Sequence, residues 1–280
     1  MQGAIGARTY RFAVADVVDD PADPRLADYV DLTDPDVRRR MEGERGFFIA
    51  ESPLVVRRLL ASGRPVRSVL VTPRQQAALA DALDGLAVPV YVAGPDVLRR
   101  VVGFDLHRGA VASAARWPLP ASADVLRGAH RVVVLEKVND HENLGLIFRS
   151  AAALGADAVL LDRECSDPLY RRSVRVSIGS VLTLPWTRVD AVGEVLDAGF
   201  DGVAFTPDEG ALELETFAWP HRCALLFGPE GPGLSRTWLE SVQWRVRIPM
   251  SGGVDSLNVA TAVAIGLYAS RSITPPAGRS

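Results

Sequence analysis

Three short clusters in the second half of the chain combine glycine with polar side chains in a way that could support binding or catalysis. The first covers residues 139–149 and contains Asn143, Gly145 and Arg149. Asparagine offers both a donor and an acceptor, and arginine offers a planar fork of donors suited to phosphate. We expect Asn143 to cap a helix and Gly145 to let another backbone approach closely. Taken alone, this segment fits an ordinary capped helix with a solvent-exposed arginine better than a site.

A second cluster, residues 226–235, is a loop rich in glycine and proline. Such a loop carries few side chains, so its backbone N–H and C=O groups can contact a flat ligand. Its spacing is neither the GxGxxG of a dinucleotide site nor the GK[ST] ending of a phosphate-binding loop. A plain tight turn is the alternative, because glycine and proline mark turns of every kind.

The third cluster covers residues 248–262 and leads into a long apolar segment. Asp255 or Ser256 is expected to cap a helix over that segment, and Asn258 places a donor and an acceptor in its first turn. The alternative is a capped helix with an incidental asparagine. Each of the three clusters is therefore a weak indication of function by itself.

The segments around these clusters predict an α/β domain with a mostly parallel sheet. Between residues 132 and 268, short aliphatic runs alternate with helical patterns, which is typical of parallel strands joined by crossover helices. The expected strands are residues 132–135, 158–161, 182–188, 202–205, 224–227 and 246–249. The expected helices are residues 144–154, 170–177, 191–198, 235–240 and 257–270.

A smaller α/β domain is predicted before it. The expected strands there are residues 47–50, 66–71 and 88–92, and the expected helices are residues 53–60 and 74–83. A proline-containing segment without periodicity follows and is typical of a linker. The predicted division is an accessory domain at residues 1–116, a linker at residues 117–123 and a main domain at residues 124–280.

The composition narrows the classes of function. The 280 residues carry a formal net charge of -3, which argues against a broad basic surface for nucleic acid but not against a local one. Lys137 is the only lysine among 31 basic residues, and arginine suits bidentate phosphate contacts, although a codon bias explains this excess equally well. Cys165 and Cys223 lack metal-ligand spacing, so neither a disulfide framework nor a bound metal is expected.

The hydrophobic pattern gives an expectation for localisation. No apolar run reaches the roughly 18 residues of a membrane helix. The N-terminal segment has acidic residues where a signal peptide needs an uninterrupted apolar core. A cytoplasmic protein without membrane attachment is therefore expected.

In this order, the three clusters closely resemble the signature motifs of the SpoU/TrmH group within the SPOUT methyltransferases. The NxGxxxR pattern is matched by Asn143, Gly145 and Arg149. The GxEGxG pattern is matched by Gly228, Glu230, Gly231 and Gly233, and the IPM…SLN pattern by residues 248–250 and 256–258.

The resemblance continues outside the motifs. Residues 175–180 are similar to the family, and residues 47–52 and 107–111 look more weakly like its accessory substrate-binding domain. His141 is a departure, because many relatives have proline at this position. This change alters the start of the first motif without removing Asn143 or Arg149.

The resemblance implies an enzyme that methylates a ribose 2′-hydroxyl of RNA with S-adenosylmethionine and without a metal. It also implies a deep trefoil knot in the C-terminal domain and a homodimer whose subunits share the active-site region. The residues that it assigns to catalysis are Asn143, Arg149, Glu230, Ser256 and Asn258. The residues that it assigns to the methyl donor are Phe227, Gly228, Glu230, Gly231, Ile248, Met250, Ser256 and Leu257.

RNA contacts are expected from Arg38, Arg39, Arg40, Arg149 and Arg175. The first three form a basic run for which a solvated face is the alternative. An accessory domain of this size resembles rRNA-directed members of the family, so rRNA is favoured over tRNA. A family member that binds RNA without catalysis is a further alternative. A nicotinamide-dependent oxidoreductase is disfavoured, because no glycine fingerprint follows the first strand.

Overall fold

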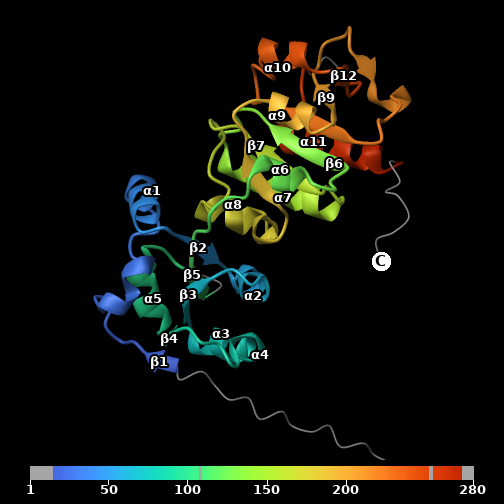
Figure 1. The fold of residues 1–280 in the computed structure, drawn as a ribbon. Helices are drawn as coiled ribbons and strands as arrows, with labels where there is room; N and C mark the ends of the chain where they lie inside the picture. The colour runs from blue at the N-terminus through green and yellow to red at the C-terminus, as the bar shows by residue number, and fades with distance from the viewer. Residues whose placement is uncertain (1–14, 107–108, 252–254, 273–280) are drawn as a thin grey trace, which may run out of the picture. The chain divides into compact units, whose positions relative to one another are not determined.

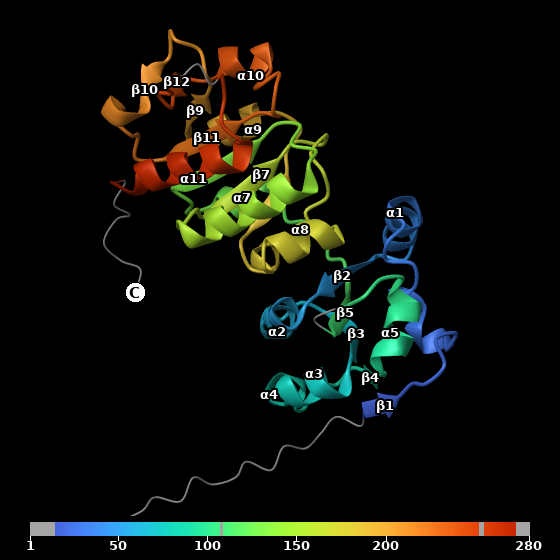
Figure 2. The same cartoon turned by 180° about the vertical axis from the view of Figure 1, so that it is seen from behind.

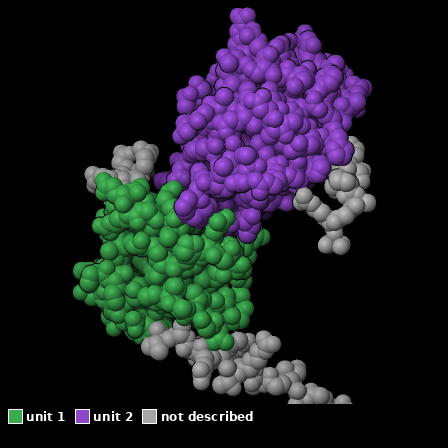
Figure 3. Space-filling model, viewed as in Figure 1, with its two compact units in different colours: residues 1–116 green, residues 117–280 purple. Residues whose placement is uncertain are grey.

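The computed structural model describes residues 15–106, 109–251 and 255–272. The chain forms two compact units, Met1–Arg116 and Trp117–Ser280 (Figure 3). The residues expected to link two domains, 117–123, belong to the second unit, where helix α6 (Ser122–Leu126) begins. Residues 107–108, part of the weaker resemblance, lie outside the described residues.

The first unit is built on a five-stranded mixed sheet with the order β1-β4-β3-β5-β2 (Figure 1). β1, β4 and β3 are parallel, and β5 runs antiparallel to β3 and β2. The strands are β1 (Ala15–Val17), β2 (Phe47–Glu51), β3 (Val66–Val71), β4 (Val90–Val92) and β5 (Ala110–Ala115). The helices are η1 (Pro24–Tyr29), α1 (Pro35–Glu44), α2 (Pro53–Ala61), α3 (Pro73–Ala78), α4 (Ala80–Leu83) and α5 (Pro95–Val102).

Helices lie on both faces of this sheet, with α5 on one face and α2 and α3 on the other (Figures 1 and 2). The three predicted strands and the predicted helix at residues 53–60 are present, but β1, β5, α1 and α5 were not expected. β5 reads AVASAA, and its small residues have a weak strand preference although nearly all of them are buried. The helix predicted at residues 74–83 is two helices that meet at Leu79.

The second unit contains a seven-stranded sheet with the order β10-β12-β9-β11-β6-β7-β8. Every pairing in it is parallel. The strands are β6 (Arg131–Leu135), β7 (Ala158–Leu161), β8 (Trp186–Arg188), β9 (Asp201–Phe205), β10 (Leu212–Glu213), β11 (Cys223–Phe227) and β12 (Trp244–Arg247). The longer helices are α7 (His141–Ala153), α8 (Arg171–Val176), α9 (Gly193–Asp197), α10 (Arg236–Ser241) and α11 (Val259–Ala269).

Two layers of helices enclose this sheet. α7 and α11 lie side by side on one face, and α6 and α9 lie on the other (Figures 1 and 2). A core on the second face joins the strands to Leu126 of α6, Val195 of α9 and Trp238 of α10. The predicted parallel α/β domain is therefore confirmed, whereas the knot that the family resemblance implies stays a prediction.

Two predicted strands of this domain were misplaced. Residues 180–182 form the short helix η2 (Ser180–Leu182), and only Trp186–Arg188 of the predicted strand 182–188 pairs with β7. Pro185 explains this limit, because a proline cannot donate to a sheet ladder. The last strand covers Trp244–Arg247 rather than residues 246–249, and Pro249 falls beyond it for the same reason.

None of the described helices combines the length and the apolar character needed to cross a membrane.

Candidate active site

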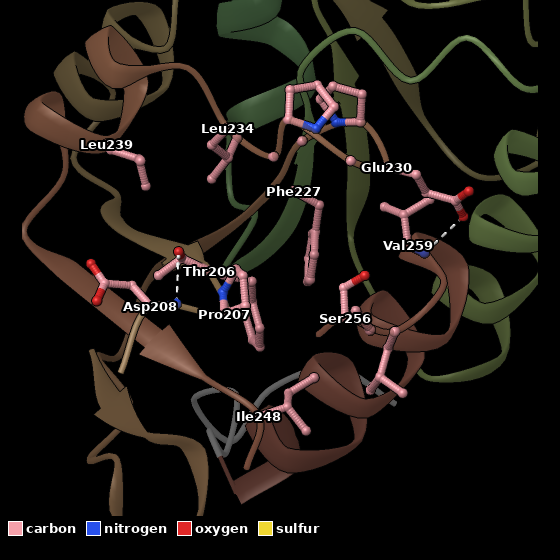
Figure 4. A pocket seen from close by; sticks show the side chains of 18 of the residues that line it. Thr206, Pro207, Asp208, Phe227, Glu230, Leu234, Leu239, Ile248, Ser256 and Val259 are labelled. Atoms are coloured by element: carbon pink, nitrogen blue, oxygen red, sulfur yellow. Dashed lines mark hydrogen bonds between the residues drawn. The ribbon is translucent and has the colours of Figure 1, made fainter. Parts of the chain in front are cut away.

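A cavity of about 350 Å³ lies where the carboxyl ends of β9, β11 and β12 meet (Figure 4). Parallel strands end at a common edge, and ligands of open α/β sheets bind outside that edge. All eight residues expected to hold the methyl donor line the cavity. The lining also includes Phe205, Thr206, Pro207 and Asp208 from the end of β9, which the motifs did not reveal.

The loop after β11 folds back on itself so tightly that it needs glycine. A Cβ atom added at Gly228 would lie 2.3 Å from the backbone nitrogen of Leu234. Gly231 and Gly233 have backbone φ angles of +87° and +68°, which residues with a Cβ atom rarely adopt. The backbone N–H of Gly233 donates to the carbonyl of Pro229 at 3.1 Å, which closes the turn. The glycines therefore bring the loop's backbone close to the cavity, beside the side chains of Pro229, Glu230, Pro232 and Leu234.

Two stacked phenylalanines form a wall of the cavity. The rings of Phe205 and Phe227 lie 4.5 Å apart between centroids, at an interplanar angle of 21°. α11 packs closely against them, because a Cβ atom at Gly266 would lie 2.6 Å from the Phe205 ring. Figure 4 shows Phe227, Ile248 and Ser256 around the same space.

The three motifs meet in one hydrogen-bonded cluster beside the cavity. Oε1 of Glu230 accepts from Nδ2 of Asn143 at 3.0 Å and from Nδ2 of Asn258 at 2.7 Å. The same Asn258 nitrogen donates to Oδ1 of Asn143 at 2.8 Å. Three residues far apart in the sequence, one from each motif, thus fix one another.

The caps of the two helices differ from those expected. Asp140, not Asn143, caps α7, and its Oδ1 accepts from the backbone N–H of Asn143 at 2.8 Å. Asn258, rather than Asp255 or Ser256, caps α11. In each helix, the side-chain oxygen of the capping residue accepts a hydrogen bond from a backbone N–H group two or three residues later in the sequence. The side chain of Asn143 is thereby left to bind Glu230.

Gly145 permits the contact between α7 and α8. A Cβ atom there would lie 2.8 Å from the carbonyl oxygen of Ser173 and 2.8 Å from Cβ of Val176. This close approach confirms the expected role of Gly145.

Arg149 lies outside the residues that line the cavity. Its side chain is exposed on α7, and no described residue forms a hydrogen bond or ion pair with it. Leu146, three residues earlier and so on the same side of the helix, is 40% exposed. The single chain therefore does not bring Arg149 to the cavity.

The predicted RNA contact by Arg38 is wrong. Its side chain is only 2% exposed and donates to Oε1 of Glu42 at 2.9 Å and to the backbone oxygen of Asp28 at 3.1 Å. A buried guanidinium needs such partners, so the Arg38 side chain is held inside the first unit and is not available to RNA. Arg175 is exposed on α8. The side chains of Arg39 and Arg40 lie outside the part of the chain that the structure describes, so their expected RNA contacts stay predictions.

Neither cysteine provides a reactive thiol for this site. Both are free and buried. Burial raises the pKa of the Cys223 thiol to about 12 and raises that of Cys165 further. Across the residues described, no group of three His, Cys, Asp or Glu side chains is arranged to hold a metal ion.

Solved structures with the same architecture define the class as RNA methyltransferases. An S-adenosylmethionine-bound rRNA methyltransferase of Sinorhizobium meliloti is 27% identical, with a TM-score of 0.77 over 92% of this chain and 98% of the other. The SpoU methyltransferase AviRb of Streptomyces viridochromogenes, in complex with the same cofactor, is 26% identical, with a TM-score of 0.75 over 92% of this chain and 100% of the other.

Sequence comparison identifies the family. The profile of the SpoU rRNA methylase family matches residues 130–268. A tRNA/rRNA methyltransferase of Mycobacterium tuberculosis, named as uncharacterized, is 49% identical over 89% of either chain. The 23S rRNA (guanosine-2′-O-)-methyltransferase RlmB of Ralstonia nicotianae is 32% identical over 69% of this chain and 82% of its own. The chain belongs to the SpoU rRNA methylase family.

Proposed function

We propose that this protein transfers a methyl group from S-adenosylmethionine to a ribose 2′-hydroxyl of rRNA in the cytoplasm. The observation that carries the proposal is the cluster of Asn143, Glu230 and Asn258, which joins all three motifs beside a cavity of ligand size. The 23S rRNA activities named for the Ralstonia relative and for a Streptomyces viridochromogenes relative support rRNA as the substrate.

The residues of the cavity fit the methyl donor. Small-molecule sites have volumes of about 300–1,000 Å³ and mostly apolar walls with a few polar groups, and this cavity matches that description. Phe227, Ile248, Met250 and Leu257 offer apolar walls, while the glycine loop offers backbone donors and acceptors. When bound, S-adenosylmethionine supplies an electrophilic methyl carbon, so a metal is not required.

The chain's own residues must align the hydroxyl and stabilise the charge that develops on its oxygen. Glu230 and the two asparagines position the loops around the cavity. Arg149 is the proposed ligand of the adjacent phosphate and of the developing alkoxide. Guanidinium groups in general are poor bases, so we propose that the proton leaves to water or to a phosphate oxygen.

The exposure of Arg149 supports a homodimer in which a second copy completes the site. α11 is apolar along almost its whole length, yet Tyr268 on it is 57% exposed, and Leu146 on the neighbouring α7 is 40% exposed. Helices that are apolar all round are normally covered on all sides. We propose that a second copy covers this α7/α11 surface, which carries Arg149 with Leu146.

The first unit is the proposed RNA-binding domain, and tRNA is the second candidate substrate. The name of the Mycobacterium relative includes both RNA classes. Purified protein would be incubated with labelled S-adenosylmethionine, a chelator and either 23S rRNA or total tRNA, and the methylated riboses mapped. Transfer to a 2′-oxygen of rRNA supports the proposal, and transfer to tRNA alone would replace the substrate. RNA binding without transfer would instead indicate a non-catalytic member of the fold.

A further inference from the structure

The cavity contains negative charge without a matching cation. Asp208 and Glu230 are the only charged residues among the described residues that line it, and the remainder are apolar, glycine or hydroxyl-bearing. Oε1 of Glu230 accepts only from neutral groups, namely two side-chain amides and the backbone N–H of Val259 at 3.4 Å. Oδ1 of Asp208 accepts from the backbone N–H of Gly210 at 2.9 Å.

This lack of compensation distinguishes the two carboxylates from several exposed carboxylates elsewhere in the second unit. Glu142, Glu164, Asp190, Glu213 and Glu240 each form an ion pair with an arginine or with Lys137. Within the described part of the chain, neither Asp208 nor Glu230 has such a partner. Two uncompensated carboxylates beside apolar walls create a negative potential that favours a cationic ligand.

We infer that Asp208, together with Glu230, makes this cavity select the positively charged sulfonium of the methyl donor over its neutral thioether product. The inference rests on the proposed function. Methyl transfer breaks the carbon–sulfur bond, leaves the electron pair on sulfur and forms a carbon–oxygen bond as the hydroxyl proton leaves. The product therefore has one positive charge fewer, and the cavity binds it less tightly than the donor.

Asp208 is the residue through which this selection can be tested. Glu230 holds the motif cluster, so its replacement would disturb the site itself. Asp208→Asn removes the charge but keeps an oxygen that can accept from Gly210, which preserves the loop. Glu209→Gln is a matched control, because Glu209 is the next residue, is also exposed and does not line the cavity.

The experiment measures the dissociation constants of S-adenosylmethionine, S-adenosylhomocysteine and sinefungin for the full-length protein by calorimetry. Sinefungin carries an amine in place of the sulfonium and so separates charge from the methyl group. Asp208→Asn should weaken S-adenosylmethionine and sinefungin by about two- to fivefold, the range of exposed charge pairs, and leave S-adenosylhomocysteine unchanged. The difference should shrink at high salt, because salt screens exposed charges.

The outcomes separate this inference from the proposed function. Equal weakening of all three ligands would place Asp208 against a part that they share, and no weakening of any of them would remove Asp208 from recognition; either result overturns the inference. The same two- to fivefold pattern in Glu209→Gln would also overturn it, because the effect would not be specific to the cavity. If the unmodified protein binds none of the three ligands, the proposed function itself fails. An unchanged melting temperature shows that each variant is folded.

Discussion

Nδ2 of Asn258 lies 2.7 Å from Oε1 of Glu230, so the third motif is hydrogen bonded to the second. Asn143 of the first motif donates to the same oxygen. A single carboxylate oxygen therefore accepts the hydrogen bonds that join the first and third motifs to the second. Glu230 is for this reason the first residue to test.

Replacing Glu230 should dissociate the motif cluster. Glu230→Ala removes the acceptor of two amide groups, and each lost hydrogen bond costs about 0.5–1.5 kcal/mol. We expect a lower melting temperature, weaker binding of S-adenosylmethionine and loss of methyl transfer. Glu230→Gln should be less severe, because its amide oxygen still accepts. Glu215→Gln, at an exposed position outside the cavity, is the control. Normal cofactor binding by Glu230→Ala would refute an organising role.

Gly145→Ala tests the close contact of α7 with α8. The new methyl group would lie 2.8 Å from the Ser173 carbonyl oxygen, and such overpacking costs about 1–3 kcal/mol. We expect a lower midpoint in thermal unfolding of the second unit. Gly193→Ala in α9 is the matched control, because nothing lies within 4 Å of its added Cβ atom. Equal stability of the two variants would contradict the packing argument.

Arg149 variants separate charge from geometry. Arg149→Ala should raise the activation free energy of methyl transfer by about 2.7–4 kcal/mol, the effect of removing one oxyanion-hole donor, which lowers the rate about 10²- to 10³-fold. Arg149→Lys should recover only part of that loss, because lysine lacks the planar fork. Cofactor affinity should hardly change, since Arg149 does not line the cavity. Single-turnover methylation at saturating RNA measures the effect, with Arg127→Ala as an exposed control. A near-normal rate in Arg149→Ala would exclude it from catalysis.

The proposed dimer can be tested at its apolar residues. Leu146→Glu and Tyr268→Glu each place a charge on the α7/α11 surface, which should dissociate the dimer because burying an unpaired charge is costly. Sedimentation velocity should show a dimer for the unmodified protein and monomers for both variants. Leu119→Glu, at another exposed leucine, should remain a dimer. A monomeric unmodified protein would rule out the dimer and leave Arg149 without the proposed route to the site.

Removal of the first unit tests whether this unit binds RNA while the second unit binds the cofactor. A chain starting at Trp117 retains all three motifs and the whole lining of the cavity. It should bind S-adenosylmethionine nearly as well as the full chain but bind RNA more weakly. Calorimetry and a filter-binding assay measure the two affinities. Unchanged RNA affinity would contradict the assignment of RNA binding to the first unit.

The sequence predicted most of what positions the site, because its strands are short apolar runs and its loops contain motif residues. Gly145 illustrates a success, since a glycine inside a helix has few explanations other than close packing. Asp208 illustrates a miss. It lies in no motif, and it joins the cavity only because β9 lies beside β11 and β12 in the sheet, an order that local patterns do not specify.

The caps show a second limit of the sequence. Asp140, Asn143, Asp255, Ser256 and Asn258 are all residue types that cap helices well. Their competition is decided by tertiary contacts, here by Glu230, which engages the side chains of Asn143 and Asn258. Arg38 was misassigned for a related reason, because a basic run does not reveal which of its members is buried against Glu42.

The double role of Asn258 couples the order of the site to the start of a helix. Its Oδ1 accepts from the backbone N–H groups of Ala260 at 3.0 Å and Thr261 at 3.2 Å, while its Nδ2 binds Glu230. Both contacts depend on one rotamer of one side chain. Opening of the motif cluster and fraying of the first turn of α11 are therefore coupled through this side chain. The amide protons of Ala260 and Thr261 can report on the coupling, because their exchange with deuterium should slow when a bound ligand stabilises the motif cluster.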